Sequence, residues 1–119
     1  MHLYVEMEDR LERSKRIERE ALRAVREGRV IKVVFEPSGR TFWLVYGRKF
    51  KRTYLVIPRL YCSCRDFLVN VFLRGKASEC YHMRARDIAE REGLYREKTL
   101  PDSELENFLR ELYHSILAI

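Results

Sequence analysis

The sequence predicts an α+β fold. Three observations lead to this prediction: apolar residues with helical periodicity at both ends of the chain, β-type runs between residues 30 and 57, and three cysteines and a histidine clustered in residues 62–82. A chain of 119 residues fits one domain with a modest core. The predicted order is an N-terminal helix, a three-stranded antiparallel β-meander, a turn held by the cysteines, and two C-terminal helices.

Residues 6–27 are predicted to form a long amphipathic helix. Apolar residues recur at three- and four-residue spacing, and acidic residues precede arginines by four positions, which is the favourable order. Gly28 is a natural stop. We expect the apolar stripe to pack on the sheet that follows, with a partner-helix surface as the alternative. The arginines on the other face are expected to be solvated.

The period then changes to that of strands. Residues 30–35, 41–46 and 53–57 are rich in β-branched and aromatic side chains, and the segments between them carry the Pro, Gly and basic residues typical of turns. These three runs predict an antiparallel meander over residues 30–57.

The cysteines and the histidine form the pattern C-x-C-x15-C-x-H, from Cys62 and Cys64 to Cys80 and His82. Ser63 allows the first two cysteines to project from one tight turn. Three thiolates and one imidazole are a complete tetrahedral shell for Zn²⁺, and soft sulfur ligands favour zinc over magnesium or calcium. Because four protein ligands leave no open position, the pattern predicts one structural zinc ion.

Two alternatives need no metal. The cysteines could be small buried apolar residues, or Cys62 or Cys64 could form a disulfide with Cys80. An odd number of cysteines suits a disulfide scaffold poorly. Residues 1–16 are charged throughout and contain no apolar core of a secretory segment, so we expect a reducing, cytoplasmic location, associated with the nucleoid in a prokaryotic or archaeal cell.

The positive charge is unevenly distributed. Residues 28–65 contain nine basic residues and a single acid, Glu36, which gives this segment +8 against +6 for the whole chain. A nucleic acid is the leading candidate for an acidic partner, and a solvated basic loop is the alternative. The predicted nucleic-acid-binding residues are Arg48, Lys49, Lys51, Arg52, Arg74 and Lys76.

Aromatic residues are interleaved with these charges. Exposed aromatic side chains can stack on bases of single-stranded nucleic acid, but aromatic residues of a small sheet more often belong to the core. The residues concerned are Trp43, Tyr46, Phe50 and Tyr54.

Residues 65–79, between the two ligand pairs, are predicted to form a short buried helix followed by a basic turn. Asp66 could cap this helix, and Leu68, Phe72 and Leu73 are apolar enough to be expected in the core. The first C-terminal helix starts at Cys80 and ends near residue 92.

Residues 102–118 have the most regular helical periodicity of the chain. Core packing is the first expectation for so strong an apolar stripe, and a subunit interface, for example in a homo-oligomer, is the alternative. The residues predicted for partner binding are Leu105, Phe108, Leu109, Leu112 and Ile116.

Several functional classes are disfavoured. The five glycines are isolated, so no phosphate-binding loop is present, and no arrangement of catalytic Ser, His and Asp or of paired carboxylates can be identified. The sequence therefore predicts a protein that is not an enzyme. No stretch approaches the ~20 apolar residues that cross a membrane.

The motif C-x-C, spacer, C-x-H resembles the SWIM zinc finger. Ala85, Ile88 and Ala89 extend the likeness to the small SWIM protein of the Shu complex and its archaeal relatives, although Ile88 stands where that family usually has Leu. Weaker matches upstream, such as residues 37–40, bring the resemblance to about residues 36–92.

This resemblance implies an accessory role in homologous recombination. Family members form complexes with RecA-type recombinase paralogues and promote recombinase filaments on single-stranded DNA, while Cys62, Cys64, Cys80 and His82 bind zinc and Ala85 packs the following helix. We therefore expect a recombinase paralogue and single-stranded DNA as partners. The alternatives are a stand-alone nucleic-acid-binding zinc protein, in transcription or RNA metabolism, and a structural homodimer.

Overall fold

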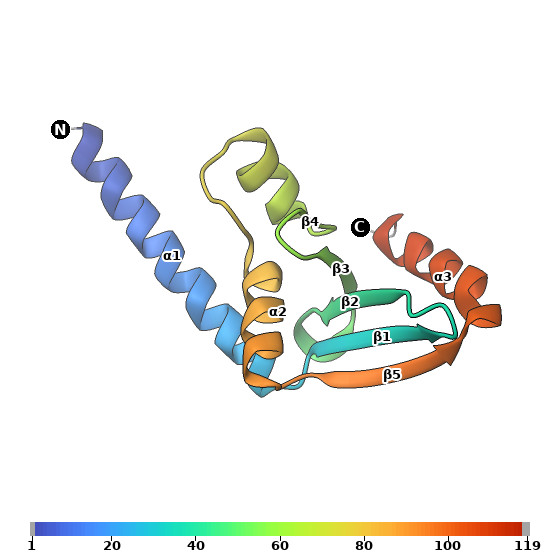
Figure 1. Cartoon of the computed structure of the whole chain (residues 1–119). Helices are drawn as coiled ribbons and strands as arrows, with labels where there is room; N and C mark the ends of the chain where they lie inside the picture. The colour runs from blue at the N-terminus through green and yellow to red at the C-terminus, as the bar shows by residue number, and fades with distance from the viewer. Residues whose placement is uncertain (1, 118–119) are drawn as a thin grey trace.

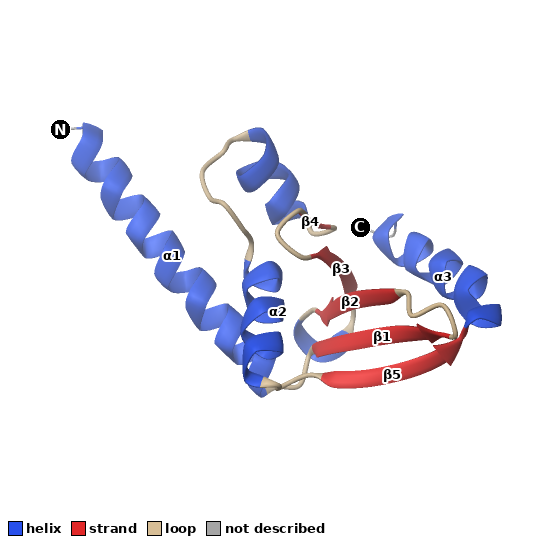
Figure 2. Ribbon diagram, viewed as in Figure 1, coloured by secondary structure: helices blue, strands red, loops and turns tan. Residues whose placement is uncertain are grey.

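The computed structural model describes residues 2–117. One long helix and two shorter ones pack around a mixed β-sheet (Figure 1, Figure 2). In chain order the elements are α1 (His2–Arg26), β1 (Val30–Glu36), β2 (Thr41–Tyr46), the 3₁₀ turn η1 (Arg48–Phe50), β3 (Thr53–Ile57), β4 (Tyr61–Cys62), the π-helical segment η2 (Phe67–Leu73), α2 (Tyr81–Glu92), β5 (Arg96–Pro101), the 3₁₀ turn η3 (Asp102–Glu104) and α3 (Leu105–Leu117).

The sheet has five strands in the order β4-β3-β2-β1-β5. The three predicted strands lie where expected and pair antiparallel, but the prediction of a three-stranded meander is wrong. The two residues of β4 extend the sheet beyond β3, and β5 pairs parallel with β1 at the opposite edge. The chain between β4 and β5, which includes α2, is therefore a crossover connection.

Side chains of the central strands alternate between two cores, one on each face of the sheet. On one face Val30, Trp43 and Val45 pack with α1, α2 and the buried cysteines. On the other face Val33 and Leu44 pack under α3. The period of two along each strand thus produces a layer of helix on both faces.

The buried residues of α1 lie in its second half. Ala21, Ala24 and Val25 are buried there. We had expected α1 to pack on the sheet, but it packs mainly against α2. The first half projects past the body of the molecule, and Met7 and Leu11 are exposed there (Figure 1). The helix ends two residues before Gly28.

The helix predicted between the ligand pairs is present as η2, but two expectations about it are wrong. Asp66 makes no capping bond, because its carboxylate accepts two hydrogen bonds from Arg13, at 2.8 and 2.9 Å. Leu68, Phe72 and Leu73 are exposed at 52, 72 and 66%. Phe67, in contrast, is buried against the core that contains the cysteines.

The α3 helix packs on the face of the sheet opposite α2, and most of its apolar stripe is covered there. Leu112 is buried, and Leu105, Phe108 and Ile116 are half-buried against the same core, whereas Leu109 is exposed. Of the predicted range 102–118, residues 102–104 form a 3₁₀ turn and residue 118 lies outside the described part of the chain. Within residues 2–117, no helix is both long and apolar enough to cross a bilayer.

Candidate metal centre

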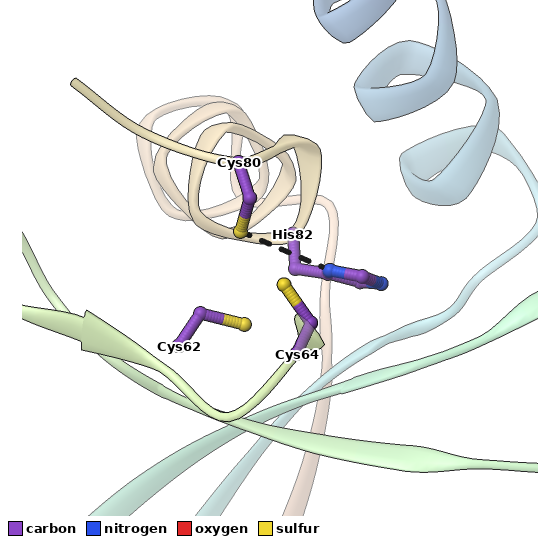
Figure 3. A group of neighbouring side chains, drawn as sticks. All are labelled: Cys62, Cys64, Cys80 and His82. Atoms are coloured by element: carbon purple, nitrogen blue, oxygen red, sulfur yellow. Dashed lines mark hydrogen bonds between the residues drawn. The ribbon is translucent and has the colours of Figure 1, made fainter. Parts of the chain in front are cut away.

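The structure brings the four predicted ligands together from two distant segments (Figure 3). Cys62 ends β4 and Cys64 lies two residues later, while Cys80 precedes α2 and His82 lies in its first turn. All four side chains are buried, and their ligand atoms lie within 4.8 Å of one another. A tetrahedral Zn²⁺ with Zn–S bonds of ~2.3 Å requires sulfur atoms roughly 3.8 Å apart, so small adjustments fit this arrangement to the ion.

Two hydrogen bonds between Ser63 and Leu55 hold the first ligand pair in place. The hydroxyl of Ser63 accepts a hydrogen bond from the backbone N–H of Leu55 at 2.9 Å, and the backbone N–H of Ser63 donates to the carbonyl of Leu55 at 3.0 Å. These two bonds fasten the residue between the cysteines to β3, so Cys62 and Cys64 both face the centre. The sequence suggested only a spacer at Ser63, because its acceptor role depends on a strand eight residues away.

The second ligand pair begins α2. Cys80 is extended, with φ −97° and ψ 175°, and lies at the N-cap position, while His82 follows within the first turn. The free N–H groups at a helix N-terminus favour negative charge nearby, which suits a thiolate at Cys80. The zinc centre therefore joins the start of α2 to the end of the β3–β4 hairpin.

The thiols of the cluster perturb one another strongly. The thiols of Cys62 and Cys80 donate hydrogen bonds to the sulfur of Cys64 and hold the pKa of Cys64 well below its usual range. Those contacts with Cys64 and Cys80, together with burial, raise the pKa of Cys62 far above its usual range. The backbone N–H of Phe67 also donates to the sulfur of Cys64, at 3.3 Å. A divalent cation is what allows all three sulfurs to be ionised in so small a volume.

Two tyrosine rings fix the orientation of His82. Its ring lies 4.3 Å from that of Tyr54 and 3.9 Å from that of Tyr81, measured between centroids. The Nδ1 atom faces the cysteines, 3.8 Å from the sulfur of Cys80 (Figure 3). Nδ1 is thus the atom placed to bind the metal, which leaves the proton on Nε2.

The Nε2 atom of His82 is buried and has no hydrogen-bond partner among the described residues. Beside it is a cavity of about 270 Å³ that Glu20 and Asp66 also line, with Arg13, Arg16 and Arg48 among the remaining side chains. Histidines that bind zinc usually donate their second ring N–H to a carboxylate, a carbonyl or a water, and the polar lining of this cavity is the nearest source of such an acceptor.

The predicted nucleic-acid-binding residues occupy two exposed segments, 48–52 and 74–76. Arg48 forms an ion pair of 2.7 Å with Glu20 of α1 and lines the cavity beside His82. Lys76 lines a second cavity of about 590 Å³ together with Arg10 and Arg13. Arg13 borders both cavities, so arginines of α1 lie between the two predicted segments.

These α1 arginines were expected to form a solvated face. Arg29 is one of the nine basic residues of segment 28–65, but it is fully buried, lies 3.1 Å from a carboxylate oxygen of Glu27, and donates to the hydroxyl of Tyr81 at 3.4 Å. Arg29 therefore supports the tyrosine that stacks on the zinc ligand His82. It is not available to an external ligand.

The aromatic residues considered for base stacking belong largely to the core. Trp43 is buried against Tyr95, with ring centroids 5.0 Å apart, and Tyr54 packs on His82. Phe50 is 49% exposed and lies 5.5 Å from Tyr46. Of the four, Phe50 is the one whose ring is open to solvent.

Comparison with known proteins supports the zinc assignment. The chain is similar to the zinc finger SWIM domain-containing protein 7 homolog of Dictyostelium discoideum, with 38% identity over 61 residues. The match covers 51% of this chain but only 39% of the relative, so this chain corresponds to less than half of that protein. No family model and no solved structure matches the chain.

The geometry of the site and the comparison agree on one metal. Cys62, Cys64, Cys80 and His82 form a buried set of four donor atoms, and the similarity is to a protein named for a SWIM zinc finger. The chain binds one structural zinc ion through these four residues.

Proposed function

We propose that this chain is an accessory protein in DNA recombination and repair, an adaptor that binds a RecA-family recombinase paralogue and contacts single-stranded DNA. The observation that carries the proposal is the zinc centre itself, in which the C-x-C and C-x-H pairs come together. Their sequence pattern resembles that of the small SWIM subunit of the Shu complex. The chain would act without catalysis, in the cytoplasm or on the nucleoid, and the partner would supply the ATPase.

The DNA contact is supported by the charges along α1. Arg10, Arg13 and Arg16 recur every three residues and line cavities that Arg48 and Lys76 also line. Acidic side chains in the same cavities, among them Glu18, Glu20 and Asp66, offset part of this charge. We therefore expect contact with a few phosphates only, each contributing about −0.7 to the slope of log K against log salt for a single strand.

Fluorescence anisotropy with labelled single-stranded DNA tests this contact. Charge reversal of Arg48, Lys49, Lys51 and Arg52 should abolish binding, and Lys98→Glu, an exposed position on β5, is the matched control. Unchanged affinity of the fourfold variant, or a binding constant that does not respond to salt, would show that this surface is not the DNA site.

The partner is tested separately by co-expression. The zinc-loaded chain should co-purify with a RecA-family paralogue encoded in the same genome, and should lose it when zinc is removed. If no such ATPase associates with the folded, zinc-loaded chain, the adaptor role is wrong, whatever the DNA measurements give.

A stand-alone nucleic-acid-binding protein, acting in transcription or on RNA, is the second candidate. The net charge of +6 favours it. It predicts tight binding to DNA or RNA by the purified chain alone, without any recombinase partner. A structural homodimer is less well supported, because most of the α3 stripe packs on the chain's own sheet. Sedimentation at high concentration distinguishes it.

A further inference from the structure

The turn between β3 and β4 and the η2 helix, both beside the zinc centre, expose several large apolar side chains to solvent. Leu60, between β3 and β4, is 74% exposed, and Leu68, Phe72 and Leu73 of η2 are 52 to 72% exposed. Contiguous apolar surface of this kind on a soluble protein marks an interaction site.

Two of these side chains, Leu68 and Phe72, border a groove of about 580 Å³. Tyr61, Phe67, Leu68 and Phe72 line one side, and Ile116 from the end of α3 lines the other. The C-terminal end of α3 lies beside β4 in the view of Figure 1, although the two are far apart in sequence. The zinc ligands Cys62 and Cys64 also line the groove, so the metal fixes its shape.

Two unusual backbone features accompany these residues. Arg59, just before Leu60, has φ +65°, a conformation that non-glycine residues adopt rarely and at a cost. The η2 segment, which carries Leu68, Phe72 and Leu73, has the wide π-helical hydrogen-bonding pattern, which is rare and often occurs at functional sites.

The lining of the groove includes one basic residue. Arg65 is exposed there and forms no ion pair within the described part of the chain. Arg59 and Arg74, next to the exposed Leu60 and Leu73, are also without an ion pair among the described residues. The nearby carboxylate, Asp66, is already bound by Arg13. An apolar groove that contains an unpaired arginine is complementary to an apolar ridge flanked by acidic side chains.

We propose that this groove binds an acidic amphipathic helix of a partner protein. A helix presents apolar side chains at three- and four-residue spacing, which fits a groove between helical walls. An added β-strand fits less well, because β4 has only two residues with which to pair. A second copy of this chain would bring the same arginines against each other across the interface.

The inference rests on the proposed function only in assigning this helix to the recombinase paralogue. The groove can be tested with a defined peptide and the zinc-loaded full chain. The probe is a labelled helical peptide of about 18 residues with leucines on one face and glutamates on the other, compared with a counterpart in which lysines replace the glutamates.

The glutamate peptide should bind more tightly than the lysine peptide. Phe72→Ser should weaken its binding by at least roughly thirtyfold, and Leu94→Ser should leave binding unchanged, since Leu94 is also an exposed apolar residue but lies between α2 and β5, outside the groove. Arg65→Glu should reverse the preference between the two peptides. Zinc content and thermal melting confirm that each variant is folded.

Equal binding of both peptides, or an unchanged affinity of Phe72→Ser, would overturn the inference. Self-association that Phe72→Ser abolishes would also overturn it, because the groove would then belong to a second copy. The co-purification experiment is independent. If the paralogue binds the wild type and Phe72→Ser equally, the groove assignment fails, whereas if it binds neither, the proposed function fails.

Discussion

The substitution Ser63→Ala tests how the zinc-binding turn is built. It removes the hydroxyl that accepts the Leu55 N–H at 2.9 Å and leaves the reciprocal backbone bond intact. A part-buried N–H without an acceptor costs about 1–3 kcal/mol of unfolding free energy. For a domain of this size, each kcal/mol corresponds to a fall of roughly 3–6 °C in the melting temperature. Zinc affinity should fall about tenfold or more, because the turn that aligns two ligands is loosened.

Urea unfolding of the zinc-loaded proteins, together with competition against a chromophoric chelator, measures both effects. Ser78→Ala is the matched control, since Ser78 lies in the exposed loop before Cys80 and makes no side-chain hydrogen bond among the described residues. If Ser63→Ala matches Ser78→Ala in both stability and zinc retention, the hydroxyl is not what positions the cysteines.

Three further predictions follow from the contacts. Removing zinc with a chelator near pH 7 should unfold the C-terminal half, visible as lost ellipticity and a lower melting temperature, because structural zinc contributes about 10–16 kcal/mol against total stabilities of about 5–15 kcal/mol. Leu112→Ala should lower the unfolding free energy by about 2–4 kcal/mol and Leu109→Ala by less than about 1 kcal/mol in denaturant titrations, since only Leu112 is buried. The hydrogen bond from Arg84 lowers the pKa of Glu18, so the stability that this pair contributes is present at neutral pH and lost on acidification. The difference in melting temperature between Glu18→Gln and wild type should therefore be small, corresponding to at most about 1 kcal/mol at neutral pH, and should disappear as the pH falls through the lowered pKa of Glu18.

The zinc ligands could be predicted from the sequence because each pair is local. Two cysteines one residue apart, and a cysteine and a histidine one residue apart, lie close together in any fold, and only the meeting of the pairs depends on tertiary structure. The three central strands were also predictable. Their two faces pack in the two cores, so most residues along them are apolar. The strand β5 was not, because Arg96, Glu97 and Lys98 give it the charged character of an edge strand.

The exposure of η2 could not be predicted from composition. Its side chains are as apolar as those of a core helix, and a sequence contains no information on which neighbours remain to cover them. Asp66 illustrates the same limit: its position before the helix favours a cap, but Arg13, 53 residues away, binds it instead. Likewise Arg29 resembles a surface residue until Tyr46 and Tyr81 are seen around it.

The zinc centre separates two surfaces of different chemistry. On one side His82 borders the cavity that Arg16 and Arg48 line, and on the other Cys62 and Cys64 line the apolar groove. Because the ligands of one ion belong to both surfaces, loss of zinc should disturb DNA contact and partner binding together. A substitution at a single surface, in contrast, should affect one and spare the other. If both results are obtained, one zinc ion supports both surfaces. Two independent binding sites would instead respond differently to the loss of zinc.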